Sequence, residues 1–187
     1  MGYTHLRSGE IRFAGREITG LPTAKRAREG IGYVPQGRQL FPDLTVAENL
    51  EMGRSISANR SQRLDMLDRV YSMFPILAER CKQRAGTLSG GQQQMAAIGR
   101  ALIGNPSLLL LDEPSEGIQP SIVGEIEQHI LALKRDLDLT ILVVEQDVQL
   151  IKAVADTCYI IDHGVTTQRL DRSEFAETDL LERNLEF

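Results

Sequence analysis

The start of one predicted helix is suited to the close approach of an anion. Ser89 and Gln92 have the S-x-x-Q spacing of a capping box, which predicts a helix N-terminus at this point. Gly90 and Gly91 place no side chains there, so backbone N–H groups and the positive end of the helix dipole can come close to a phosphate. A pair of glycines can also be ordinary turn chemistry, so this stretch alone does not establish a phosphate site.

Two carboxylates follow a short apolar run further along the chain. Asp112 and Glu113 come directly after a run of leucines, and Pro114 prevents a further ladder hydrogen bond, which places the acids at a strand tip. One acid suits a magnesium ion, and the other can activate an attacking water. The two acids could instead supply N-terminal charge to the next helix. Combined with the bare helix start, they favour nucleotide hydrolysis.

Hydrophobic spacing predicts the elements that position these groups. Met95, Ile98 and Leu102 give the helix one apolar face, and Pro106 follows its end. Residues 108–111 form a continuous apolar run, which is typical of a parallel strand buried on both faces. The carboxyl ends of such strands are where α/β sheets bind ligands.

The rest of the chain alternates predicted strands and helices. Strands are predicted over residues 31–34 and 140–144, the second of them buried, and a second capping box at residues 45–48 opens a helix. Residues 162–164 are predicted to form a hairpin turn. This alternation predicts an α/β fold with a parallel sheet.

Composition restricts the class of protein. The chain has 187 residues, which suits one domain, and its 42% hydrophobic and 25% charged residues are ordinary for a globular chain. A net charge of −5 weighs against nucleic acid as the main partner. Cys81 and Cys158 lack metal-binding spacing. No apolar run approaches the length of a membrane-spanning helix, so we expect a cytosolic protein that reaches a membrane only through a partner.

Three consecutive motifs resemble those of the ABC-transporter ATPases. Residues 88–92 (LSGGQ) resemble the signature motif, residues 108–113 resemble the Walker B strand, and residues 115–120 resemble the D-loop. The resemblance implies a P-loop NTPase-like parallel-sheet core with a helical subdomain, and an ATPase that uses ATP and Mg²⁺. It also implies that Ser89, Gly90, Gly91 and Gln92 contact the nucleotide.

Two glutamines gain a role from the same resemblance. Gln36 resembles the Q-loop glutamine, which touches magnesium and the attacking water, although a glutamine after a strand is by itself usually a surface residue. Gln146 stands where many family members have a histidine that contacts the γ-phosphate; its amide can donate a hydrogen bond but cannot carry a proton. The resemblance therefore assigns Asp112 and Gln36 to magnesium, and Glu113 and Gln146 to catalysis.

The resemblance covers nearly the whole chain and implies partners. Residues 1–187 correspond to a single ABC ATPase domain, in which residues 42–104 are approximately the helical subdomain that docks on transmembrane permease subunits. Two ATP molecules lie between two such domains in the family, so a second ATPase subunit is expected, in a homodimer or a heterodimer. Neither nucleic acid nor direct membrane insertion is implied. The expected location is cytoplasmic, peripheral on the inner face of the cell membrane.

One element of the family is absent from this sequence. A hydrolytic P-loop needs G-x-x-x-x-G-K-S/T, and the chain contains no Gly-Lys pair. In the family this Walker A loop precedes the stretch that matches residues 9–15, so we expect an N-terminally incomplete domain, truncated before Gly9 and lacking the Walker A strand, loop and helix. Its loss would expose apolar edges on neighbours such as residues 108–111, and the chain alone is predicted to be inactive.

Several functions remain open at this stage. Residues 30–50 resemble the importers of branched-chain amino acids or urea, and residues 116–122 resemble the urea branch, so the first hypothesis is a urea importer subunit. A branched-chain amino acid importer subunit is the second, and a non-catalytic fragment that only donates its signature motif to a partner ATPase is the third. A chromosome-maintenance or DNA-repair ATPase would need long heptad segments or a basic surface, and neither is visible.

Overall fold

A three-stranded parallel sheet lies at the centre of the computed structural model, which describes all residues except 5, 55–59, 176–180 and 182–187, and the side chains of 60–64. Its strands are β3 (Ile31–Val34), β4 (Leu108–Asp112) and β5 (Thr140–Val144), in the spatial order β3-β4-β5. Both pairings are parallel, with Val34 opposite Leu111 and Leu111 opposite Val143. The predicted α/β fold is confirmed.

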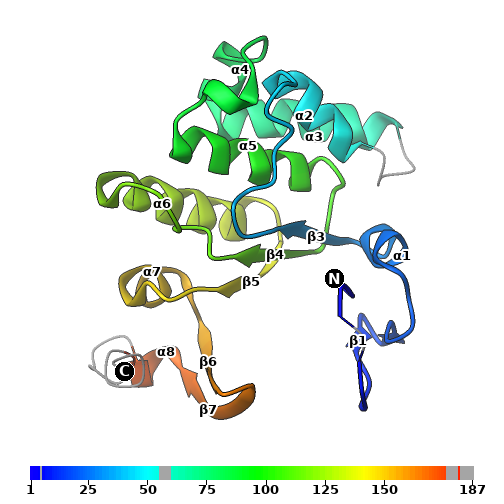
Figure 1. The fold of residues 1–187 in the computed structure, drawn as a ribbon, viewed down its shortest axis with the longest axis vertical. Helices are drawn as coiled ribbons and strands as arrows, with labels where there is room; N and C mark the ends of the chain where they lie inside the picture. The colour runs from blue at the N-terminus through cyan, green and yellow to red at the C-terminus, as the bar shows by residue number, and fades with distance from the viewer. Residues whose placement is uncertain (5, 55–59, 176–180, 182–187) are drawn as a thin grey trace.

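A group of helices connects β3 to β4 and occupies one end of the molecule (Figure 1). It consists of α2 (Val46–Gly53), α3 (Arg60–Met73), α4 (Pro75–Glu79), the 3₁₀ turn η1 (Ala85–Thr87) and α5 (Gly90–Leu102). Both predicted capping boxes are confirmed, because the side chains of Thr45 and Ser89 accept from the backbone N–H three residues later in each case. Local sequence therefore sets where α2 and α5 begin.

Shorter elements surround this frame. An N-terminal hairpin of β1 (Arg12–Phe13) and β2 (Arg16–Glu17) precedes α1 (Thr23–Arg28). After β4 come α6 (Pro120–Asp136), β5 and α7 (Val148–Val154), and then an antiparallel hairpin of β6 (Thr157–Asp162) and β7 (Val165–Asp171) that leads to α8 (Arg172–Phe175). His163 and Gly164 have φ values of 47° and 81°, as a type I′ turn requires, so the predicted hairpin turn is confirmed.

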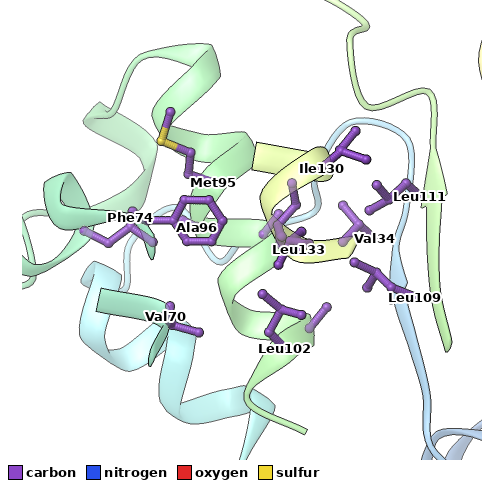
Figure 2. Close-up of a cluster of buried hydrophobic side chains, with 14 of the residues drawn as sticks. Val34, Val70, Phe74, Met95, Ala96, Leu102, Leu109, Leu111, Ile130 and Leu133 are labelled. Carbon is purple, nitrogen blue, oxygen red and sulfur yellow. The ribbon is translucent and has the colours of Figure 1, made fainter. Parts of the chain in front are cut away.

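The main core lies between one face of the sheet and the helices α5 and α6 (Figure 2). Val34, Leu109 and Leu111 point from the strands toward Leu102 of α5 and Leu133 of α6, and all five side chains are almost fully buried. Side chains alternate along a strand, so alternate residues of β3 and β4 supply this core. Burial of these leucines and valines is the main stabilising contribution to the sheet.

The opposite face of the sheet is open, which corrects two expectations. Residues 108–111 were predicted to be buried on both faces, but only Leu109 and Leu111 are buried, whereas Leu108 and Leu110 are intermediate. The strand at 140–144 was also predicted to be buried, yet Leu142 is 53% exposed. The reason is that α5 and α6 cover one face only, and an apolar sequence does not reveal which face a helix will cover.

The exposed sheet edge is also not where it was expected. Apolar edges were predicted on residues 108–111, but β4 is the middle strand and is paired on both sides. Among the described residues, β3 and β5 each pair with β4 alone, so the two edges of the central sheet belong to β3 and β5, and β6 and β7 pair only with each other. None of the helices in the described part of the chain combines the length and the apolar character needed to span a bilayer.

Candidate functional site

The tips of the three parallel strands bring together a carboxylate and two amides. Glu113 follows β4, Gln36 follows β3 and Gln146 follows β5. The Nε2 atom of Gln36 donates to Oε2 of Glu113 at 2.8 Å, and the Nε2 atom of Gln146 donates to Oε1 of Glu113 at 2.8 Å. Three predicted site residues that lie far apart in the sequence therefore form one hydrogen-bonded group.

The backbone at Glu113 supports this arrangement. Glu113 has a φ of 46°, an uncommon left-handed conformation for a residue with a side chain. Its N–H donates to the carbonyl oxygen of Val144 at 2.8 Å, so the bend remains tied to β5. Strained backbone of this kind is concentrated at functional sites, where the surrounding structure holds it in place.

Asp112, the predicted magnesium ligand, is held by a tyrosine on the neighbouring strand. The hydroxyl of Tyr33 donates to Oδ2 of Asp112 at 2.9 Å. Burial, together with this hydrogen bond to Asp112, raises the pKa of Tyr33 to about 12, so the phenol keeps the proton that it donates. Tyr33 therefore orients the carboxylate of Asp112 on the open face of the sheet.

The N-terminus of α5 lies against the segment that follows β4. A Cβ atom on Gly90 would lie 3.5 Å from the carbonyl oxygen of Gly117, and one on Gly91 would lie 2.6 Å from Cγ2 of Ile122. The second distance is too short for a side chain, so Gly91 permits the close approach of α6. This packing reason for a glycine was not visible in the sequence, and it exists alongside the predicted role in approaching a phosphate.

The loop after Gln36 is fixed by two arginines. Arg38 and Gln39 have φ values of 66° and 45°, and Arg100 of α5 donates to the carbonyl oxygens of both, at 3.1 Å and 2.9 Å. Nη2 of Arg38 in turn donates to the carbonyl oxygen of Glu116 at 2.7 Å. Burial lowers the pKa of Arg100, but a guanidinium titrates so far above neutrality that it stays charged.

The donor set suits magnesium that arrives together with a nucleotide. Within the described residues there is no group of three or more His, Cys, Asp or Glu side chains that could hold a metal ion. Magnesium is commonly bound through one or two protein carboxylates plus substrate phosphates, so Asp112 fits as a single carboxylate ligand. Because Nε2 of Gln36 makes the hydrogen bond to Glu113, the amide oxygen is the atom of Gln36 that could bind the ion.

Four residues that hold these strand tips in place were not predicted from the sequence: Tyr33, Arg38, Arg100 and Glu145, whose carboxylate accepts from the backbone N–H of Ser115 at 3.0 Å. Glu145 had the clearest signal, since it is an acid at a strand tip directly before a predicted site residue. The two arginines gave no such signal. Their partners are backbone carbonyl groups that only the folded chain brings within reach.

Comparisons with known proteins agree on one family. A family model described as ABC transporter matches residues 1–116. The chain is 45% identical over 163 residues to the high-affinity branched-chain amino acid transport ATP-binding protein BraG of Pseudomonas aeruginosa, covering 87% of this chain and 69% of that protein. It is 37% identical over 182 residues to the probable branched-chain amino acid transport ATP-binding protein LivF of Archaeoglobus fulgidus, covering 97% of this chain and 77% of that protein.

Solved structures agree with the sequence relatives. The ADP conformation of MJ1267, an ATP-binding cassette of an ABC transporter, superposes with a TM-score of 0.82 and 25% identity, covering 97% of this chain and 76% of that one. CbiO1 from Clostridium perfringens, part of the transporter complex cbiONQ, gives a TM-score of 0.81 at 25% identity, covering 97% of this chain and 74% of that one.

Proposed function

Because the chain belongs to the ABC transporter family, we propose that it is the ATP-binding subunit of an importer whose reaction centre lies at the tips of β3, β4 and β5. The observation that carries this proposal is the group formed by Gln36, Glu113 and Gln146. A carboxylate held on both oxygens by amide donors is oriented before substrate arrives, as a general base for an attacking water needs to be.

Each side chain then has a distinct task. Glu113 accepts the proton of the attacking water, and Gln36 and Gln146 keep its carboxylate in one orientation. Gln146 itself can only donate or accept hydrogen bonds, so the proton stays with Glu113. Asp112, oriented by Tyr33, and Gln36 would hold Mg²⁺. When bound, this ion neutralises charge on the transferred phosphoryl group.

The signature helix serves a second ATPase subunit in this proposal. Ser89, Gly90, Gly91 and Gln92 would present the N-terminus of α5 to a nucleotide held mainly by the partner. Since the sequence contains no Gly-Lys pair, we propose that this chain by itself binds ATP weakly and does not hydrolyse it measurably. Turnover is therefore a property of the assembly.

The helical group is the proposed contact with the membrane partner. Residues 42–104, which include α2 to α5, would form a subdomain within one ATPase domain over residues 1–187 and would dock on transmembrane permease subunits. Arg100 connects this subdomain to the loop after Gln36, so docking can be communicated to the strand tips. The subunit would then be cytoplasmic and peripheral on the inner face of the membrane.

Branched-chain amino acids are the proposed class of transported solute, because BraG and LivF, at 45% and 37% identity, are named for their transport. Urea is the second candidate, favoured by the resemblance of residues 116–122 to the urea branch. An ATPase subunit does not itself contact the solute, so only transport by the assembly can decide between them.

The test is uptake by the purified assembly. The chain is tagged in its source cells, its complex is purified and placed in proteoliposomes, and ATP-driven entry of labelled leucine and labelled urea is measured. We expect leucine uptake that needs ATP and is lost in the Asp112→Asn variant. Urea uptake would transfer the assignment to the second candidate, and a complex without permease subunits or ATP-driven uptake would contradict the importer function.

A further inference from the structure

Glu145 links the turn after β4 to the turn after β5. One of its carboxylate oxygens, Oε1, accepts from the backbone N–H of Ser115 at 3.0 Å and also from the hydroxyl of Ser115. The other, Oε2, accepts from the backbone N–H of Gln146 at 2.8 Å and from that of Asp147 at 3.4 Å. One half-buried carboxylate is therefore shared by the two turns that surround Glu113.

Each turn is also held by contacts of its own, and Glu145 joins the two. Ser115 lies two residues after Glu113, whose left-handed backbone bends the chain at the tip of β4. On the other side, Oδ1 of Asp147 accepts from the N–H groups of Gln149 and Leu150 at 2.9 Å and 3.1 Å and caps α7. Among the described residues, the side chains of Glu145 and Gln146 cross between these turns, and that of Glu145 reaches Ser115.

The position of Gln146 depends on the same contacts. Its backbone N–H is held by Glu145, and its side chain reaches Oε1 of Glu113 at 2.8 Å. If Ser115 moves, the carboxylate of Glu145 has to move with it or lose its hydrogen bonds to Ser115. Because the same carboxylate binds the backbone N–H of Gln146, the movement would also displace Gln146. The connection runs from the segment after β4, through Glu145 and Gln146, to Glu113.

A carboxylate is the side chain that this junction requires. Four donors converge on it, three backbone N–H groups and one hydroxyl, and an ionised carboxylate can accept on both of its oxygens. A glutamine at Glu145 would keep the shape but offer one oxygen, and its NH₂ group would face N–H donors. At least one of the two turns would then lose its acceptor.

We propose that Glu145 is a positioning residue: through its contacts with Ser115 and Gln146 it holds the Gln146 amide on Glu113 and transmits movement of residues 115–120 to that contact. This inference rests on the proposed ATPase function, because it concerns the same base. Glu145 is not a catalytic residue in this proposal, since it touches Glu113 only through Gln146 and Ser115. Arg38 also donates to the carbonyl oxygen of Glu116, so a movement of the loop after β3 can displace the segment 115–120.

The first test observes the coupling in the chain itself. Glu145→Gln and Ser115→Ala are compared with the wild type and with Glu125→Gln, an exposed acid on α6, by amide exchange and by ¹⁵N NMR of the Gln146 side chain. In Glu145→Gln we expect the Gln146 NH₂ resonances to move to the positions they take in Glu113→Gln, and the N–H groups of Ser115 and Gln146 to exchange at least about tenfold faster. Ser115→Ala should have a smaller effect, and Glu125→Gln none.

The second test asks whether the coupling matters for the reaction. In the purified importer complex, Glu145→Gln should lower the kcat of ATP hydrolysis by about 10- to 100-fold, because a misplaced catalytic group loses rate on that scale, and should change the KM for ATP less than about twofold. A structural residue would instead lower the amount of folded complex and leave its kcat unchanged.

The outcomes separate the positioning role from the proposed function. Unchanged Gln146 resonances in Glu145→Gln would overturn the coupling, and an unchanged kcat with shifted resonances would overturn its role in the reaction. If the wild-type complex hydrolyses no ATP while the resonances still shift, the proposed ATPase function fails and the coupling between the turns stands without a catalytic role.

Discussion

The side chains of β4 that point toward α5 and α6 are almost fully buried, whereas side chains of β5 that point the other way are about half exposed. Leu109 and Leu111 are 0% and 1% exposed, but Leu142 and Val144 on the opposite face are 53% and 56% exposed. Apolar side chains of one sheet therefore lie in two environments, buried under the helices on one face and exposed on the other. The proposed site lies at the border between them, because Asp112 and Tyr33 belong to the open face while the segment after Glu113 lies against the N-terminus of α5.

This difference in burial separates the residues that stabilise the sheet from the residues of the proposed site. Packing against α5 and α6 holds the strands in register, and that register brings Gln36, Glu113 and Gln146 together at one edge. The open face contributes little packing of its own but leaves Asp112 beside exposed surface. Substitutions on the two faces should consequently change the free energy of unfolding by different amounts.

The largest expected effect is the loss of a leucine from the packed face. Leu109→Ala should lower the free energy of unfolding by about 2–5 kcal/mol, because it removes buried methyl groups and leaves a cavity under α5 and α6. The matched substitution Leu142→Ala, on the open face, should cost no more than about 1 kcal/mol. Urea unfolding of both variants measures the difference, and equal losses would show that the open face is covered in solution.

A pair of glycines extends the comparison to the helices. A Cβ atom on Gly53 of α2 would lie 2.1 Å from the carbonyl oxygen of Arg100, so Gly53→Ala should destabilise the chain by about 1–3 kcal/mol through overpacking. Nothing lies within 4 Å of a Cβ atom on Gly124 of α6, so Gly124→Ala should raise stability by about 0.5–1 kcal/mol through helix propensity. Thermal unfolding measures both: unchanged stability in Gly53→Ala would contradict the close contact of α2 with α5, and a loss in Gly124→Ala would contradict the open space at α6.

A smaller effect is expected at the cap of α2. Thr45→Ala removes the hydroxyl that accepts from the N–H of Glu48 at 3.2 Å and should cost about 1 kcal/mol. Thr45→Ser retains the hydroxyl and should stay close to the wild type. Chemical denaturation gives both values; a Thr45→Ser variant as unstable as Thr45→Ala would mean that the methyl group, and not the cap, is responsible.

The smallest effect is a dependence of stability on pH at His129. The ring centroid of His129 lies 4.8 Å from that of Phe74. Burial of the His129 ring lowers its pKa, and the charge of Glu125 opposes this shift. A lowered pKa means that the unfolded chain binds the proton more readily, so stability should fall as the pH drops below about 6.5, the ordinary value for histidine, and should be flat above it. The His129→Asn variant should lack this part of the pH dependence, as measured by unfolding from about pH 7.5 to about pH 5.5. Identical profiles would contradict the stated burial effect.

Features encoded by neighbouring residues were predicted from the sequence. The helix starts at Ser89 and Thr45 and the strand at residues 31–34 were correct, because capping boxes and short apolar runs act through local contacts. The turn at 162–164 was also correct, since consecutive residues with positive φ have a recognisable composition.

Features that depend on the packing of distant segments were not predicted. The burial of residues 108–111 on both faces was wrong, because the covering helices come from elsewhere in the chain. The glycine requirement at Gly91 and the role of Glu145 were missed for the same reason: Ile122 and Ser115 become neighbours only in the folded chain. Candidate site residues were found where a strand ends, but the contacts that orient them were not.

The role of Glu113 as the base is tested by the rate of ATP hydrolysis of the purified importer complex that carries Glu113→Gln in this chain. Gln36 donates to one oxygen of Glu113 and Gln146 to the other, and this carboxylate is the proposed base. We expect a loss of about 10²- to 10⁴-fold in kcat, with Mg²⁺-ATP still bound by the complex. A Glu113→Gln complex that hydrolyses ATP at the wild-type rate would contradict this role.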